Sequence, residues 1–285
     1  HHSPLCRFHN TDKIFHPKMQ WNILPLAALV SFRCFDSCTL AFSQNVQVFG
    51  SAPLRSHLKS SKTASVGSQK KLPRTLQALA HDDSDAFDPK TVLSLVGGQS
   101  VLIFVAIAVA AVIGTPNFGL GTNIDFGTSA VTQGFMMALP LGVIACALDV
   151  IEGDFPSLQN VTKATQRSIL EWLGGSFKPL MGLSAAIALG VAAGLGEEML
   201  FRGVLQYEIG IRGGDVLAVA VASVIFGTLH AVTPLYALLS SLASVYFGYL
   251  YLSSGNLAVP VCTHAFYDIG ALFYTHWTVA QMSDA

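Results

Sequence analysis

The chain has 285 residues, of which 52% are hydrophobic and only 12% are charged, and its mean hydropathy is +0.52. Because soluble domains average roughly a quarter charged residues, this composition excludes an ordinary soluble protein and indicates an all-α polytopic membrane protein. The net charge of −1 and the pI near 6.8 also argue against a nucleic-acid partner, since domains that bind nucleic acid are basic.

The first 90 residues do not have the pattern of a membrane bundle. The chain does not begin with Met, so we interpret 1–18 as an upstream or non-native extension. An apolar stretch followed by a small-residue cleavage pattern predicts a signal peptide over 19–41. Residues 42–80 contain no Asp or Glu but many serines and several basic residues, which is typical of transit peptides. An acidic linker, 81–90, then precedes the hydrophobic part of the chain.

A signal peptide joined to an acid-free basic segment resembles the bipartite presequences of algae with secondary plastids. This resemblance implies an integral membrane protein of the plastid envelope or thylakoid. The alternative is an ordinary secretory signal followed by a basic linker, which would leave the protein in the endomembrane system.

Apolar runs predict a bundle of about six transmembrane helices, because roughly twenty apolar residues are needed to cross a bilayer. The runs lie at 92–114, 127–150, 178–207, 215–231, 234–252 and 256–274. We expect Pro140 to interrupt the second run and 165–173 to form a short amphipathic helix at the membrane interface. The links between the last three runs are short, which predicts that these helices are antiparallel neighbours.

Glu197, Glu198 and Arg202 lie inside the third run, where charge is costly. A charged side chain in hydrocarbon costs at least a few kcal/mol, so a function is the default explanation. Glu198 and Arg202 are four residues apart and share a helix face, whereas Glu197 is five residues from Arg202 and faces elsewhere. We therefore expect Glu198 to pair with Arg202 and Glu197 to remain available as a general base.

Two histidine motifs lie in later apolar runs. Phe226 and His230 end the fourth run, and His264 and Asp268 lie four apart in the sixth. Taken singly, each has a structural explanation, as a helix-end histidine or a buried pair. A purely structural role poorly explains why these histidines occur together with the glutamates, because buried ion pairs seldom add much to the stability of a fold. Glu197 with the two histidines is also a plausible zinc set, and this alternative remains open, although the sequence has no His-Glu-x-x-His.

The three motifs together resemble those of the CAAX-protease and bacteriocin-processing family of glutamate-type intramembrane endopeptidases, which read Glu-Glu-x-x-x-Arg, Phe-x-x-x-His and His-x-x-x-Asn. They occur here in the family's order, and the resemblance covers about 178–276, which we expect to be a catalytic domain preceded by two spans and a polar loop over 91–177. One departure is Asp268, where the family most often has Asn. An ionised carboxylate cannot donate a hydrogen bond.

The resemblance implies an endopeptidase that acts on a membrane or prenylated peptide or protein, in contact with membrane lipid and without a cofactor. The site residues that it implies are Glu197, Glu198, Arg202, His230, His264 and Asp268. In the implied mechanism Glu197 and His230 activate a water molecule, while His264, with Asp268, stabilises the oxyanion and the other two residues shape the site. The alternative is a non-catalytic membrane scaffold or chaperone of the same fold that binds a plastid partner protein.

Overall fold

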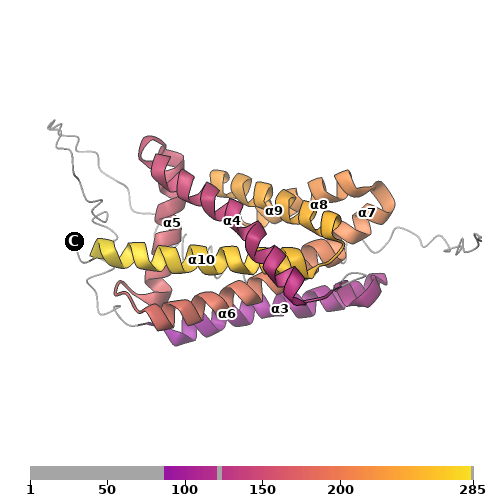
Figure 1. Cartoon of the computed structure of the whole chain (residues 1–285), viewed down its shortest axis with the longest axis horizontal. Helices are drawn as coiled ribbons and strands as arrows, with labels where there is room; N and C mark the ends of the chain where they lie inside the picture. Colours follow the sequence, from indigo (N-terminus) through magenta and orange to yellow (C-terminus); the bar gives the residue numbers. More distant parts are fainter. Residues whose placement is uncertain (1–86, 121–123, 284–285) are drawn as a thin grey trace, which may run out of the picture.

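The computed structural model describes residues 87–120 and 124–283. The predicted extension, signal peptide, transit-like segment and most of the acidic linker lie outside these residues. Within the described part every regular element is a helix, and the helices form one elongated bundle (Figure 1). This confirms the prediction of an all-α polytopic membrane protein.

A helix is present at each of the six predicted positions. The longer helices are α3 (Pro89–Ile113), α4 (Thr128–Ile151), α5 (Pro156–Leu173), α6 (Pro179–Glu198), α8 (Asp215–Leu229), α9 (Pro234–Ser254) and α10 (Ala258–Ser283). The shorter ones are the 3₁₀ turns η1 (Pro116–Gly119) and η2 (Glu152–Asp154), the π-helix η3 (Met199–Gln206) and α7 (Tyr207–Gly213). Among the described residues, four helical stretches are long and apolar enough to cross a membrane: α3, α4 with η2, the continuous 35-residue rod from α6 to α7, and α9.

Helices α4 and α5 differ from what the sequence predicted for them. Pro140 lies inside α4, which continues through it. Prolines are tolerated inside membrane helices because neighbouring helices and small local changes of the backbone provide hydrogen bonds for the groups that the proline leaves unpaired. Helix α5 is longer than the predicted segment and already begins at Pro156, a residue suited to the first helical position because it lacks an N–H. In Figure 1, α5 runs steeply across the other helices at one end of the bundle.

The prediction that the last three helices are mutual neighbours is only partly right. Helices α8 and α9 pack against each other, but α10 packs mainly against α6 and α4 and much less against α9. Glycines on α6 explain this choice. A Cβ atom at Gly190 would lie 2.9 Å from the carbonyl oxygen of Ala265, and one at Gly194 would lie 2.9 Å from that of Val261. Small residues thus let the α6 and α10 backbones approach closely, as at other membrane helix interfaces.

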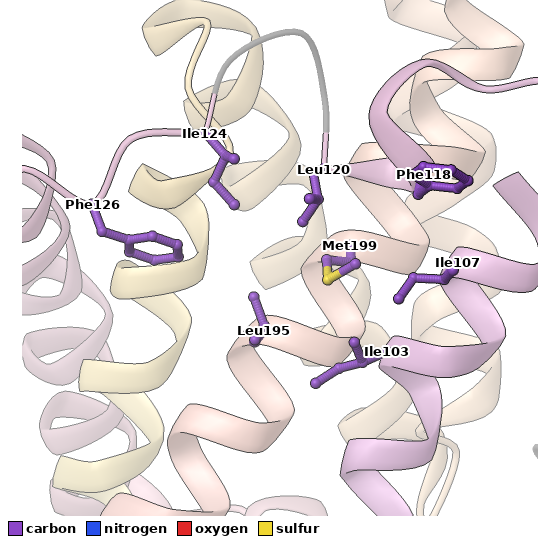
Figure 2. Close-up of a pocket in the computed structure, with 8 residues that line it drawn as sticks. All are labelled: Ile103, Ile107, Phe118, Leu120, Ile124, Phe126, Leu195 and Met199. Carbon is purple, nitrogen blue, oxygen red and sulfur yellow. The ribbon is translucent and has the colours of Figure 1, made fainter.

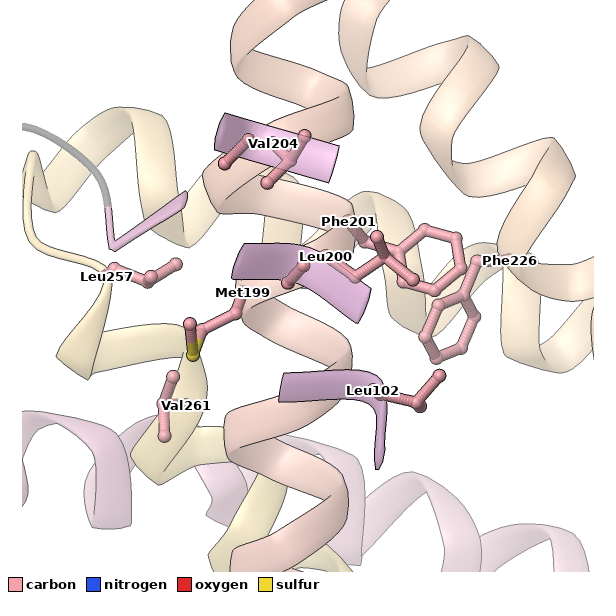
Figure 3. Close-up of a cluster of buried hydrophobic side chains, with 10 residues drawn as sticks. Leu102, Met199, Leu200, Phe201, Val204, Phe226, Leu257 and Val261 are labelled. Atoms are coloured by element: carbon pink, nitrogen blue, oxygen red, sulfur yellow. The ribbon is translucent and has the colours of Figure 1, made fainter. Parts of the chain in front are cut away.

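The largest cluster of buried apolar side chains surrounds η3. Figure 3 shows side chains of η3 meeting others from α3, α8 and α10. The labelled members are Leu102, Met199, Leu200, Phe201, Val204, Phe226, Leu257 and Val261. Because η3 packs against helices on several sides, the positions of Glu197 and Glu198 at the end of α6 are fixed.

Candidate active site

The site is built around the junction of α6 and η3. Glu197 and Glu198 are the last residues of α6, and Arg202 lies inside the π-helix that follows. Segments of π-helix are rare and are often found at functional sites. The sequence did not predict this change of helix type. The change begins at Met199, inside the Glu-Glu-x-x-x-Arg motif.

Arg202 is completely buried, and both of its terminal nitrogens are hydrogen-bonded. One terminal nitrogen donates to Glu198 Oε1 over 3.0 Å, and the other donates to the backbone oxygen and to the hydroxyl of Ser244 over 2.8 Å each. The guanidinium also lies 5.3 Å and 5.4 Å from the ring centroids of Phe226 and Phe247, within the range of cation–π contacts. The predicted Glu198–Arg202 pair is therefore present, with 0% exposure of both side chains. The contribution of α9, through Ser244 and Phe247, was not predicted.

His264 continues this network on α10. Its Nδ1 lies 2.9 Å from Glu198 Oε1, and its Nε2 lies 3.4 Å from Asp268 Oδ2. The ring stacks on Phe247, with centroids 4.8 Å apart and an interplanar angle of 12°. Because Glu198 is an acceptor, Nδ1 carries a proton, so Nε2 can donate only when the ring is doubly protonated. A carboxylate on each side favours that charged form.

Glu197 and His230 form a separate pair. Glu197 Oε2 is buried, has no hydrogen-bond partner among the described residues and lies 3.7 Å from His230 Nε2. His230 Nδ1 lies 2.8 Å from the backbone oxygen of Phe226, and the two rings stack with centroids 4.3 Å apart. Phe226 thus fixes the imidazole from one side, with Nδ1 donating and Nε2 free to accept. The 3.7 Å gap is too long for a hydrogen bond and is suited to a bridging water molecule.

The structure brings all six predicted site residues together, in one four-membered network and one adjacent pair. Exposure changes across the site. The Glu198 and Arg202 side chains are sealed and Glu197 is 4% exposed, whereas His230 and Asp268 are 24% and 28% exposed. The polar site therefore opens on one side, between the end of α8 and the Asp268 turn of α10.

The zinc alternative is not supported by the arrangement of its proposed ligands. Across 87–120 and 124–283 no three His, Cys, Asp or Glu side chains form a group suited to hold a metal ion. The two nitrogens of His264 face Glu198 and Asp268. They are not directed to a position shared with Glu197 and His230.

An apolar cavity of about 500 Å³ lies on another face of the same helical rod. Its lining residues come from α3, from the α6–η3 junction and from the segment around η1 (Figure 2), and all are apolar. Leu195 and Met199 point into it. At about 100° per residue, Glu197 faces roughly the opposite way. The cavity is therefore separate from the polar site, and the sequence did not predict it because its walls come from distant segments.

Residues 179–270 match the family model described as Type II CAAX prenyl endopeptidase Rce1-like. The match begins at the start of α6, ends within α10 and includes every residue of the polar site. It confirms the family resemblance that the three motifs indicated. No curated protein and no solved structure matches the chain.

Proposed function

We propose that this protein is a membrane-embedded endopeptidase that hydrolyses a peptide bond in a membrane-bound or prenylated peptide or protein, with 178–276 as its catalytic domain behind two further spans over 91–177. The Rce1-like match points to a membrane protease in general. The observation that carries the finer proposal is the Glu197–His230 pair. A buried carboxylate without a partner faces an oriented imidazole across 3.7 Å.

In the proposed reaction a water molecule lies between Glu197 Oε2 and His230 Nε2. Glu197 accepts one proton of the water, and His230 accepts a hydrogen bond from its second O–H. The water oxygen then adds to the carbonyl carbon of the substrate, and the C=O electron pair becomes an oxyanion. When the C–N bond breaks, the proton held by Glu197 passes to the leaving nitrogen. The immediate products are a carboxylic acid and an amine, and transfer of the acid proton to the amine then gives a carboxylate and an ammonium group.

The network around Arg202 positions the oxyanion side of the site. Arg202 neutralises Glu198, and Glu198 in turn holds Nδ1 of His264. The opposite nitrogen of His264 is then directed toward the open side, where it lies near Asp268. In its doubly protonated form this ring donates to the oxyanion, and such preorganised donors are usually the largest single contribution to catalysis of this kind.

The test is peptide cleavage by the purified protein in liposomes, with a mixed library of prenylated and unmodified peptides analysed by mass spectrometry. Glu197→Gln removes the base without changing the size of the side chain, so we expect the rate to fall by at least about 10²-fold. Glu208→Gln is the matched control, because Glu208 lies farther along the same rod and pairs with Arg212 and Thr115. Cleavage at the wild-type rate by Glu197→Gln would refute the proposal. Cleavage that a chelator abolishes and zinc restores would replace the metal-free mechanism with a metal-dependent one.

Asp268 favours a second candidate, a non-catalytic scaffold that binds a plastid partner protein. An acceptor in the position of the usual donor weakens an oxyanion site but does not prevent recognition of a partner. If this candidate is correct, wild type and Glu197→Gln both leave every peptide intact and capture the same partner with the same affinity.

We also propose that 19–80 deliver the protein to the plastid. The support is compositional: an apolar leader is followed by a serine-rich, basic and acid-free segment. A fluorescent protein fused behind 1–80 should accumulate in plastids of an alga with secondary plastids. Retention of this fusion in the endomembrane system would refute plastid delivery and support the alternative of a secretory signal.

A further inference from the structure

The proposed oxyanion site lacks one expected hydrogen-bond donor. Asp268 offers only acceptor oxygens when ionised, and its Oδ2 lies 3.4 Å from His264 Nε2. An oxyanion that forms beside these two groups gains a donor from His264 but meets the negative charge of Asp268. A second donor must therefore come from another part of the site if the oxyanion is to be stabilised as in other acyl-transfer enzymes.

One face of α9 lines the polar site. Tyr236, Ser240, Ser244 and Phe247 are spaced at i, i+4, i+8 and i+11, so they share this face. Ser244 binds Arg202, and Phe247 stacks on His264. Tyr236 is in the first turn of the helix, nearest to the open side of the site.

The start of α9 fixes the position of Tyr236. Thr233 caps the helix, and its hydroxyl accepts a hydrogen bond from the Tyr236 backbone N–H over 3.1 Å. Only three residues separate His230, at the end of α8, from Pro234, the first residue of α9. The short loop therefore holds the first turn of α9 beside His230, and the turn cannot move away without moving that histidine.

The Tyr236 side chain is near enough to the groups of the proposed reaction to interact with them electrostatically. It interacts electrostatically with the carboxylates of Asp268 and Glu197 and with the phenol of Tyr267. It is partly buried, and its hydroxyl has no hydrogen-bond partner in the part of the chain that the structure describes. An O–H donor is thus available near both the water-activating carboxylate and the acidic residue that replaces a donor.

We infer that Tyr236 is a further catalytic residue, whose phenolic O–H donates a hydrogen bond to the oxyanion in place of the amide that an Asn at position 268 would offer. Asp268 then acts as a positioning residue that holds His264. No bond to Tyr236 forms or breaks; its proton stays on the phenol while the substrate C=O becomes C–O⁻. The inference rests on the proposed endopeptidase function.

The first experiment compares Tyr236→Phe with wild type in the liposome assay, on a peptide that wild type cleaves. Removal of one oxyanion donor should lower kcat about 10²-fold and leave KM nearly unchanged, since the donor acts in the transition state. Tyr249→Phe is the matched control, because Tyr249 is on the same helix but 63% exposed. A kcat of Tyr236→Phe equal to wild type, with Glu197→Gln inactive, would overturn the role of Tyr236 and leave the endopeptidase intact. Equal cleavage by wild type and Glu197→Gln would overturn the endopeptidase itself.

A second variant separates a lost donor from a misfolded site. Asp268→Asn supplies an amide N–H₂ group at the open side of the site, so combining it with Tyr236→Phe should restore kcat to within about tenfold of wild type, given that one donor is worth about 10²-fold. A purely structural role for Tyr236 predicts no such recovery. If Tyr236→Phe reduces kcat by the same factor with Asp268 or with the Asp268→Asn substitution in place, the inference is wrong.

Discussion

Arg202 offers the sharpest test of how the site is held together. Arg202→Met keeps a long side chain but removes three hydrogen bonds, one to Glu198 and two to Ser244. It also leaves Glu198 with 0% exposure and with His264 as its remaining partner. Breaking a buried ion pair by removing one partner typically costs about 3–5 kcal/mol, because the other charge stays buried without compensation. We expect a loss of stability of that size.

The measurement is reversible unfolding in mixed micelles, followed by helical circular dichroism. Arg212→Met is the matched control, since Arg212 also pairs with a glutamate four residues earlier but is 57% exposed. The exposed Arg212 guanidinium is screened by solvent, although the Glu208 carboxylate itself is only 10% exposed, so this variant should lose less stability than Arg202→Met. The contrast between two Glu–Arg pairs on one rod isolates the effect of burial.

A second substitution tests the cause of the loss. Adding Glu198→Gln to Arg202→Met removes the uncompensated charge, so the double variant should be more stable than the single one. Residues of one ion-pair network typically couple by about 0.5–3 kcal/mol. A cost below about 1 kcal/mol for Arg202→Met, or no recovery in the double variant, would refute the view that Arg202 chiefly neutralises Glu198.

Two further predictions concern a close contact beside the site and the cap of α3. Gly203→Ala places a Cβ atom 1.7 Å from the carbonyl oxygen of Gly119, so it should push η1 away from η3 and cost about 1–3 kcal/mol of stability through overpacking. Gly142→Ala is the control, because its Cβ atom meets nothing within 4 Å, and it should leave the unfolding midpoint unchanged. Equal midpoints for the two variants would show that the contact between Gly203 and Gly119 is not tight. The hydrogen bond from Thr91 lowers the pKa of Asp88, the N-cap of α3, below its ordinary value of 3.8. The stability that the ionised Asp88 carboxylate contributes is therefore present above pH 3.8 and is lost as the pH falls through the folded-state pKa. Asp88→Ala should therefore lower the unfolding midpoint at pH 7, and this effect should shrink as the pH falls and the carboxyl becomes protonated in the folded state. An effect independent of pH would contradict this cause.

Local spacing predicted the parts of the site that lie within one helix. Glu198 and Arg202 are four residues apart, and a helix brings such residues together whatever surrounds it. The positions of the helices also followed from the apolar runs. The residues that α9 contributes could not be predicted in this way, because Ser244 and Phe247 look like ordinary small and apolar residues of a membrane helix. Their role depends on which face of α9 meets η3.

The partner of α10 shows a second limit. Short links indicate which helices are adjacent in the chain, but not which surfaces approach most closely. The glycines of α6 decide that, since they let α10 come within backbone contact and carry His264 to Glu198. A glycine pattern along a membrane helix is a signal for such an approach, but it does not name the partner helix. The change from α-helix to π-helix after Glu198 left no pattern in the sequence that we can identify.

Under the proposed endopeptidase function, the one-sided opening of the polar site limits the form in which a substrate can be cut. Access exists beside His230 and Asp268, whereas the Arg202 side is sealed. A carbonyl group inside an intact helix already accepts a hydrogen bond from the N–H four residues later, and the helix is about 10–12 Å wide with its side chains. A scissile bond must therefore reach Glu197 as an extended, unwound strand that enters from one direction. Flexible ends and loops of membrane proteins meet this requirement, while the middle of a stable transmembrane helix does not.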